Sequence, residues 1–268
     1  MRDMFLFIRD GWKSIWKQKA IWLFSSVAVF NQLYNAIQVT KPTDLPSSFI
    51  SLTVSLILMI LFYVSYIGVP YLAYRFLIGK PATIQETLSA VKKTYGRVLG
   101  CSLLGFLVVS PFLFWALVVS INSSTRSIEL SNTTLLAFLP LSLFSALWQF
   151  TLVGFFENNW GIRQSLDRAW GLFKNNFGVL SVIGLLLTIT FRSYSALSGI
   201  LTVLIQSGFD LSSVSTINLL NPSASLGRNL LFVLINGIGQ IVFAPLSASI
   251  FIFAYLKYNY VRPPSQMW

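Results

Sequence analysis

Six long apolar runs set the limits on what this sequence can fold into. They cover residues 20–39, 49–76, 98–121, 134–156, 176–205 and 228–256. An α-helix needs roughly 20 residues to cross the hydrocarbon core of a bilayer, and these runs are of that length or longer. Only 10% of all residues are charged, compared with about 25% in soluble domains. We therefore predict an all-α polytopic membrane protein with six transmembrane helices.

A charged amphipathic segment precedes the first, third and fifth of these runs. In the last of the three segments, the apolar residues fall at helical spacing on one face: Ile162, Leu166, Ala169, Trp170 and Phe173. Similar segments begin at Met4 and at Ile84, and Thr83 with Glu86 forms a capping box before the second. We call them the first, second and third elbow, and we predict interfacial helices at the membrane surface.

The elbows recur at a nearly constant period. Their first residues are separated by 80 and 78 positions, and each is followed by a span, a loop and a second span. A fixed period with a fixed order of elements is typical of an internal repeat. We predict one membrane domain, residues 1–268, built from three units at about 1–80, 81–158 and 159–258, with a short tail at 259–268.

The distribution of basic residues predicts the orientation. Of the 19 Lys and Arg residues, all but four lie on the elbow side of the apolar runs. The four exceptions are Lys41, Arg126, Arg192 and Arg228. Since cytoplasmic loops retain Lys and Arg, we expect a multi-pass protein of the cell membrane with both termini cytoplasmic. The same explanation accounts for the net charge of +11, so we expect no nucleic-acid partner.

The sequence offers little material for catalysis. It contains no His, which removes Ser-His-Asp triads and His-based zinc sites, and no carboxylate falls inside an apolar run. The single cysteine, Cys101, is read as a small apolar residue. We therefore expect no enzymatic activity, no metal site and no cofactor. The missing mid-membrane acid also disfavours an ion-coupled transporter.

Two groups of residues are candidates for function. The first would contact lipids, expected to be anionic, or a partner membrane protein: Lys92, Lys93, Arg163, Arg168, Lys174 and Trp170. The second is a set of amides inside the apolar runs: Asn31, Asn35, Gln149, Asn236 and Gln240. These amides either line a polar cavity or form hydrogen bonds between helices. The polar stretch 157–159 beside Arg163 either binds a headgroup or cation, or ends and caps a span.

Two short motifs carry a family resemblance. Residues 75–86 (RFLIGKPATIQE) and 161–170 (GIRQSLDRAW), with Lys174-Asn175-Asn176 after them, resemble bacterial six-span proteins related to the membrane domain of glycerophosphodiester phosphodiesterases. The resemblance is to members that consist of the membrane part alone. The catalytic barrel of the larger relatives is missing, and its histidines cannot exist in a chain without His. The resemblance therefore implies a membrane module and does not carry over an activity.

Together these patterns favour a non-enzymatic integral membrane module that organises lipids or partner proteins at the cytoplasmic leaflet. The alternative is a carrier or a channel-like component for a small solute or lipid, in which the buried amides would line the path.

Overall fold

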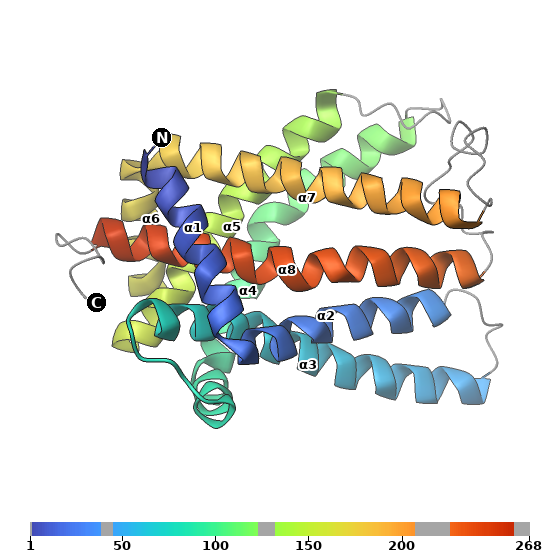
Figure 1. The fold of residues 1–268 in the computed structure, drawn as a ribbon, viewed down its shortest axis with the longest axis horizontal. Coiled ribbons are helices and arrows are strands. Elements are labelled where there is room, and N and C mark those ends of the chain that lie inside the picture. The colour runs from blue at the N-terminus through green and yellow to red at the C-terminus, as the bar shows by residue number, and fades with distance from the viewer. Residues whose placement is uncertain (1, 39–44, 123–131, 207–225, 260–268) are drawn as a thin grey trace.

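The computed structural model describes residues 2–38, 45–122, 132–206 and 226–259, and this part of the chain is entirely helical (Figure 1). The eight helices are α1 (Arg2–Lys17), α2 (Lys19–Gln38), α3 (Leu45–Leu77), α4 (Ile84–Asn122), α5 (Asn132–Asn158), α6 (Ile162–Asn175), α7 (Phe177–Gln206) and α8 (Leu226–Asn259). The prediction of an all-α fold is confirmed. The tail at 260–268 and most of the predicted outer loops lie outside the described residues.

Three helices are long and apolar enough to cross a membrane within the described residues. They are Leu52–Leu77 in α3, Phe177–Thr202 in α7 and Leu231–Asn259 in α8, with mean hydropathies of 2.3, 1.6 and 1.8. Large apolar side chains on α4 and α8 point away from the protein, for example Phe106, Leu107 and Ile238. Such extensive exposure suits lipid as the solvent. The other three predicted spans fall on α2, α4 and α5 and stay a prediction.

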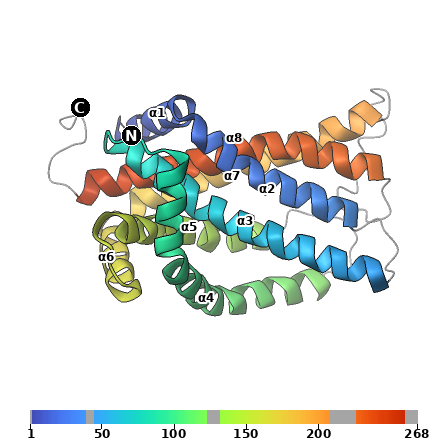
Figure 2. The same ribbon diagram turned by 90° about the horizontal axis from the view of Figure 1, so that it is seen from below.

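The long helices run along the molecule, and the elbows gather at one end. Figures 1 and 2 show α2, α3, α7 and α8 lying along the long axis of the molecule, whereas α1 and α6 lie across the end at which α8 ends. Helix α8 packs against α1, α2, α3, α5, α6 and α7. Its residues Ile250, Phe251 and Tyr255 are almost completely buried, so α8 forms the centre of the core.

The three elbows differ in how they join their spans. Elbows one and three are the separate helices α1 and α6, which end before Gln18 and Asn176. The second elbow is instead the N-terminal part of α4, which bends and continues into the predicted span without a break (Figure 2). Gly96 and Gly100 stand in this continuous stretch. The capping box is confirmed: the Glu86 N–H donates to Thr83 Oγ1 (3.2 Å), and the Thr83 N–H donates to Glu86 Oε2 (2.8 Å).

All three elbows bury the same positions against the bundle, at offsets i, i+4 and i+7. The buried triplets are Phe7, Gly11 and Ser14; Thr87, Val91 and Thr94; and Ser165, Ala169 and Leu172. These triplets are related by the same 80- and 78-residue periods as the elbow starts. The apolar face predicted from sequence is therefore shared between two environments. One edge packs on the bundle, and the other stays exposed, with Trp12 and Trp170 accessible at 44% and 56%.

Candidate functional site

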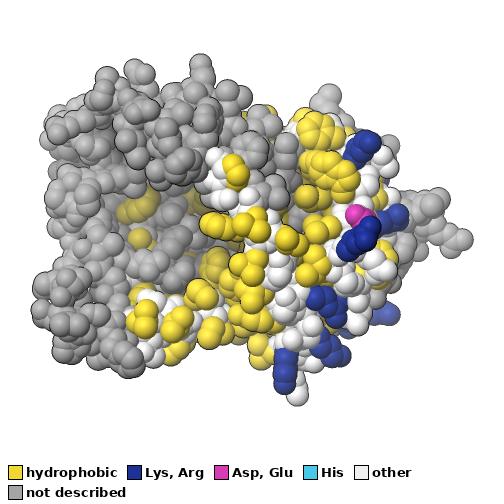
Figure 3. Space-filling model, turned by 180° about the vertical axis from the view of Figure 1, so that it is seen from behind, with side chains coloured by type: hydrophobic (Ala, Val, Ile, Leu, Met, Phe, Trp, Pro, Cys, Tyr) yellow, Lys and Arg dark blue, Asp and Glu magenta, His cyan; other side chains and the backbone are white. Residues whose placement is uncertain are grey.

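Positive charge gathers at the elbow end of the molecule. Every Lys and Arg side chain that the structure describes lies on α1, at the start of α2, at the end of α3, in the loop after it, on the second or third elbow, or at the end of α8. Figure 3 shows these basic side chains at one end, beside hydrophobic side chains. The side chains of Lys41, Arg126, Arg192 and Arg228 lie outside the description.

Exposed tryptophans accompany these charges. Trp12 and Trp16 are 44% and 57% exposed, and their rings pack edge-to-face with centroids 5.9 Å apart. On the third elbow, Trp170 stacks on Phe173 with centroids 5.8 Å apart. An indole that has an apolar ring and one N–H donor is suited to the boundary between lipid tails and headgroups.

The predicted contact residues of the third elbow lie on the surface but do not converge. Arg163 faces Asp167 at 3.9 Å, and both side chains are largely exposed, so this ion pair contributes little stability. Arg168 Nε donates to Asn259 Oδ1 of α8 (3.0 Å), as does its Nη2, which ties this elbow to the bundle. Lys174 is exposed in the last turn of α6, where the helix dipole favours a cation.

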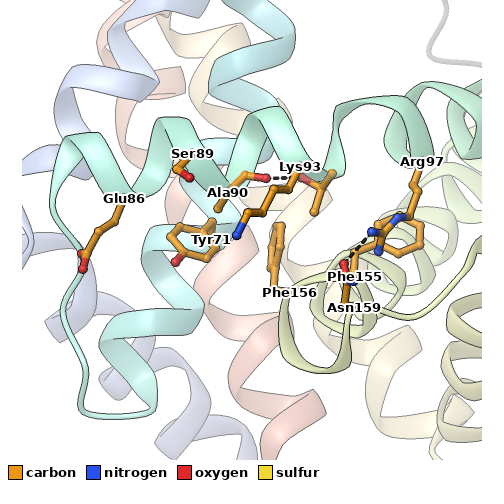
Figure 4. A pocket seen from close by; sticks show the side chains of 10 residues that line it. Tyr71, Glu86, Ser89, Ala90, Lys93, Arg97, Phe155, Phe156 and Asn159 are labelled. Carbon is orange, nitrogen blue, oxygen red and sulfur yellow. Dashed lines mark hydrogen bonds between the residues drawn. The ribbon is translucent and has the colours of Figure 1, made fainter.

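The second elbow borders a cleft of about 660 Å³, shown in Figure 4. Its walls come from the elbow part of α4, from the end of α3, and from the end of α5 with the residue after it. The lining residues are Tyr71, Glu86, Ser89, Ala90, Lys93, Thr94, Arg97, Phe155, Phe156 and Asn159. Of the predicted contact residues only Lys93 lines this cleft, whereas its neighbour Lys92 is exposed outside it.

Two cations of the cleft have no acidic partner among the residues that the structure describes. Arg97 Nη2 donates to Asn159 Oδ1 (2.5 Å), and Nη1 donates to the Trp160 carbonyl oxygen (3.0 Å). Both acceptors are neutral, so they orient the guanidinium without cancelling its charge. Asn159 adopts a left-handed backbone conformation (φ 53°), which asparagine tolerates better than most residues. Lys93 has neither a hydrogen-bond nor an ion-pair partner within the described part of the chain.

The remaining lining residues divide the cleft into a polar and an apolar side. Glu86 is the single acid among them, and its carboxylate is engaged by the Thr83 N–H. Phe156 packs edge-on against Tyr71, with ring centroids 5.3 Å apart. The cleft therefore offers positive charge beside an aromatic wall. This combination fits an amphipathic anion.

The residues of the polar stretch at the end of α5 make contacts with two different helices. Asn159 turns toward Arg97 in the cleft, whereas Glu157 accepts a hydrogen bond from Tyr255 Oη of α8 (3.3 Å). Partial burial raises the pKa of the Glu157 carboxyl above its usual range, and the Tyr255 hydrogen bond and the charge of Arg168 oppose that shift. Glu157 therefore belongs to the junction of α5, α6 and α8.

The structure describes some side chains of the predicted amide cluster and not others. Gln149 and Asn236 are buried, and within the described residues Gln149 Oε1 and Asn236 Oδ1 have no hydrogen-bond partner. Gln240 is half-buried, and the side chains of Asn31 and Asn35 lie outside the description. The described amides do not line the cleft. The cluster as a whole stays a prediction.

Arg97 and Tyr71 were not among the site residues predicted from sequence, whereas Asn159 belongs to the polar stretch 157–159, for which binding of a headgroup or cation was one of two alternatives. A signal for Arg97 was present, because it stands four residues after Lys93 and shares its face of the helix. No comparable signal pointed to Tyr71, which reaches the cleft from α3.

Comparisons with models of known protein families, with curated proteins and with solved structures find no match to this chain. The fold and the site therefore define the class: a helical protein with three candidate membrane spans and a basic, tryptophan-bearing end.

Proposed function

We propose that this chain is a six-span membrane protein whose elbows lie on the cytoplasmic leaflet. There it acts as a non-enzymatic module that organises anionic lipids or a partner membrane protein. One observation carries the proposal: the basic side chains in the described part of the chain lie at the elbow end, beside exposed tryptophans. The cytoplasmic leaflet attracts such residues, each contributing roughly 1 kcal/mol near the surface.

The triplicated architecture is part of the proposal. It is supported by the buried triplets of the three elbows, which repeat at the periods of the elbow starts. Three units of the same architecture would place three basic elbows around one bundle, all facing the same leaflet. The relationship to the membrane domain of glycerophosphodiester phosphodiesterases is proposed with it. Its support is the two motifs, which form the α3–α4 junction and the start of α6.

The orientation can be tested with single cysteines in a Cys101→Ser background. Gln164 is exposed on the third elbow, and Ser123 belongs to a predicted outer loop that is not described by the structure. In intact cells, a cysteine at position 123 should react with an impermeant thiol reagent, and one at position 164 should react only after permeabilisation. The reverse pattern would overturn the proposed orientation.

Lipid organisation can be tested by native mass spectrometry of protein released from nanodiscs that contain phosphatidylcholine and phosphatidylglycerol. Replacing Arg163, Arg168 and Lys174 by Gln should lower the amount of phosphatidylglycerol retained. The matched control removes three charges from the predicted outer side, with Lys41→Gln, Arg126→Gln and Arg228→Gln. The proposal fails if both triple variants lower retention equally, or if neither does.

A carrier for a small solute or lipid is the second candidate. Within the described residues the amide oxygens of Gln149 and Asn236 have no hydrogen-bond partner, which favours a carrier, because buried polar groups normally have such partners and a passing solute would supply them. Under this alternative, Gln149→Leu and Asn236→Leu would abolish function in a well-folded protein. Neutralising the elbow charges would leave function intact.

A further inference from the structure

We propose that the cleft between the second elbow and the end of α5 binds the headgroup of one anionic phospholipid, with the phosphate held by Lys93 and Arg97. The inference rests on the proposed function, which places this end of the bundle at the cytoplasmic leaflet. It adds a discrete site to a diffuse surface attraction. In Figure 4, the Lys93 and Arg97 side chains stand on either side of Phe156.

The charge pattern of the cleft calls for an anion. Lys93 and Arg97 are four residues apart on α4, so their side chains leave adjacent turns on one face of the helix. Like charges at this spacing repel each other, and within the described residues neither has an acidic partner. A phosphate within reach of both side chains offsets the repulsion and accepts charge-assisted hydrogen bonds from both.

Arg97 is already oriented before any ligand arrives. A guanidinium has five N–H donors, and two of those in Arg97 are used on Asn159 and on the Trp160 carbonyl. The other three are available to phosphate oxygens. Because the group is fixed by neutral acceptors, less conformational freedom is lost on binding. Asn159 is thus a positioning residue for Arg97.

The apolar side of the cleft favours a lipid over a free phosphate. Tyr71, Phe155 and Phe156 form a wall beside the two cations, which can pack against the glycerol and the first acyl carbons of a phospholipid. Inorganic phosphate has no group that uses this wall. The volume of about 660 Å³ also lies within the range of sites for whole small molecules, roughly 300–1,000 Å³.

The test compares two neighbouring lysines of the full-length protein in phosphatidylcholine nanodiscs that contain a small fraction of phosphatidylglycerol. Native mass spectrometry counts the phosphatidylglycerol molecules that stay bound. Lys93→Gln should lower the population with one bound phosphatidylglycerol about fivefold, the effect of losing one well-placed cation. Lys92→Gln removes the same charge from the same elbow but outside the cleft, so only its share of the surface attraction is lost and the population should fall by a smaller factor than with Lys93→Gln. Thermal denaturation of each variant confirms folding.

Two further variants test the geometry and the sign of the charge. Asn159→Gly keeps the left-handed backbone accessible and removes the Oδ1 that orients Arg97, so retention should fall by about twofold to threefold. Glu86→Gln removes the one acid lining the cleft, yet Gln still completes a capping box, so retention should rise. A fall in retention with Glu86→Gln contradicts an anion site.

The remaining outcomes separate the possible failures. Equal effects of Lys92→Gln and Lys93→Gln overturn the discrete site and leave the proposed surface attraction standing. If wild-type protein prefers phosphatidylglycerol no more than phosphatidylcholine, both proposals fail. A final arm adds millimolar inorganic phosphate to protein in pure phosphatidylcholine nanodiscs. If this phosphate occupies the site and Lys93→Gln abolishes its binding, a free phosphate compound replaces the lipid as the ligand.

Discussion

The first and third elbows each take part in a close contact at a glycine, and the second elbow borders a cleft. At Gly11 of α1, a Cβ atom would lie 2.9 Å from Ile250 Cγ1, so α1 and α8 are in close contact there. At Gly154 of α5, a Cβ would lie 2.9 Å from Ser165 Oγ of α6. By contrast, Gly96 on the second elbow and Gly171 on the third have no such neighbour within 4 Å of that position.

The comparison shows how equivalent elbows can differ, with close helix contacts at two of them and a cleft at the other. The buried position held by Gly11 in the first elbow is Ala169 in the third and Val91 in the second. The largest of these three side chains therefore stands where the second elbow packs, and it is 4% exposed. The second elbow is also continuous with its span, so it cannot pivot independently. The cleft with Lys93 and Arg97 borders this elbow.

Overpacking the contact between α5 and α6 should give the largest effect. Gly154→Leu places a side chain where Ser165 Oγ, Ser165 Cβ and the Trp160 ring already lie within 3.3 Å of the Cβ position. Overpacking of this kind costs about 1–3 kcal/mol, and it should appear as a lower midpoint of thermal denaturation in detergent.

The control for this substitution is Gly96→Leu on the second elbow. That position has space and is helical, so stability should stay equal or rise by up to about 1 kcal/mol. If both substitutions destabilise the protein equally, the contrast between the close contact at Gly154 and the unoccupied position at Gly96 is wrong.

A smaller effect is expected from equivalent hydroxyls of two elbows. The Ser14 hydroxyl of α1 is hydrogen-bonded to Ser249 of α8 (2.8 Å), and both residues are fully buried. Ser14→Ala should therefore cost about 1 kcal/mol. Thr94 holds the same position in the second elbow but bonds Ala90 O of its own helix (2.8 Å), so Thr94→Val should cost less than about 0.5 kcal/mol. Chemical or thermal denaturation in micelles would rank the two variants.

Inside the bundle, replacing an amide should matter still less. Asn236 Oδ1 has no partner among the described residues, so Asn236→Leu loses no hydrogen bond at that atom and removes a buried polar group. We expect a stability change of no more than about 0.5 kcal/mol and unchanged retention of phosphatidylglycerol. A large loss of function with normal stability would instead favour the carrier.

The smallest effect concerns pH at the junction with the third elbow. Burial raises the pKa of Glu157, so the folded protein holds this proton at pH values where the unfolded chain has released it. The contribution of Glu157 to stability is therefore largest below its ordinary pKa of 4.5 and falls as pH rises through the raised value. Glu157→Gln keeps an acceptor for Tyr255 and should flatten this part of the stability profile. A wild-type profile that is no steeper than that of the variant would contradict the argument.

Local features of the structure could be predicted from sequence, and the cleft could not. The capping box at Thr83 and Glu86 is local, and its pattern suffices. The period of the elbows is also visible in the sequence, yet it does not reveal which edge packs on the bundle, because lipid and protein core attract the same side chains. Hence Trp170 is exposed whereas Ser165 is buried. Asn159 meets Arg97 across 62 residues, through a backbone conformation that no periodicity predicts.

The central position of α8 has a consequence for biosynthesis. Both α1 and α2 pack against α8, and Ser14 bonds a residue 235 positions later in the chain. At translation rates of about 5–20 residues per second, the first elbow waits roughly 10–50 seconds for this partner to emerge from the ribosome. During that interval, the first two helices must be held by lipid, by α3 or by the insertion machinery. Premature stop codons ahead of α8 would therefore strand the N-terminal helices and expose them to quality-control proteases.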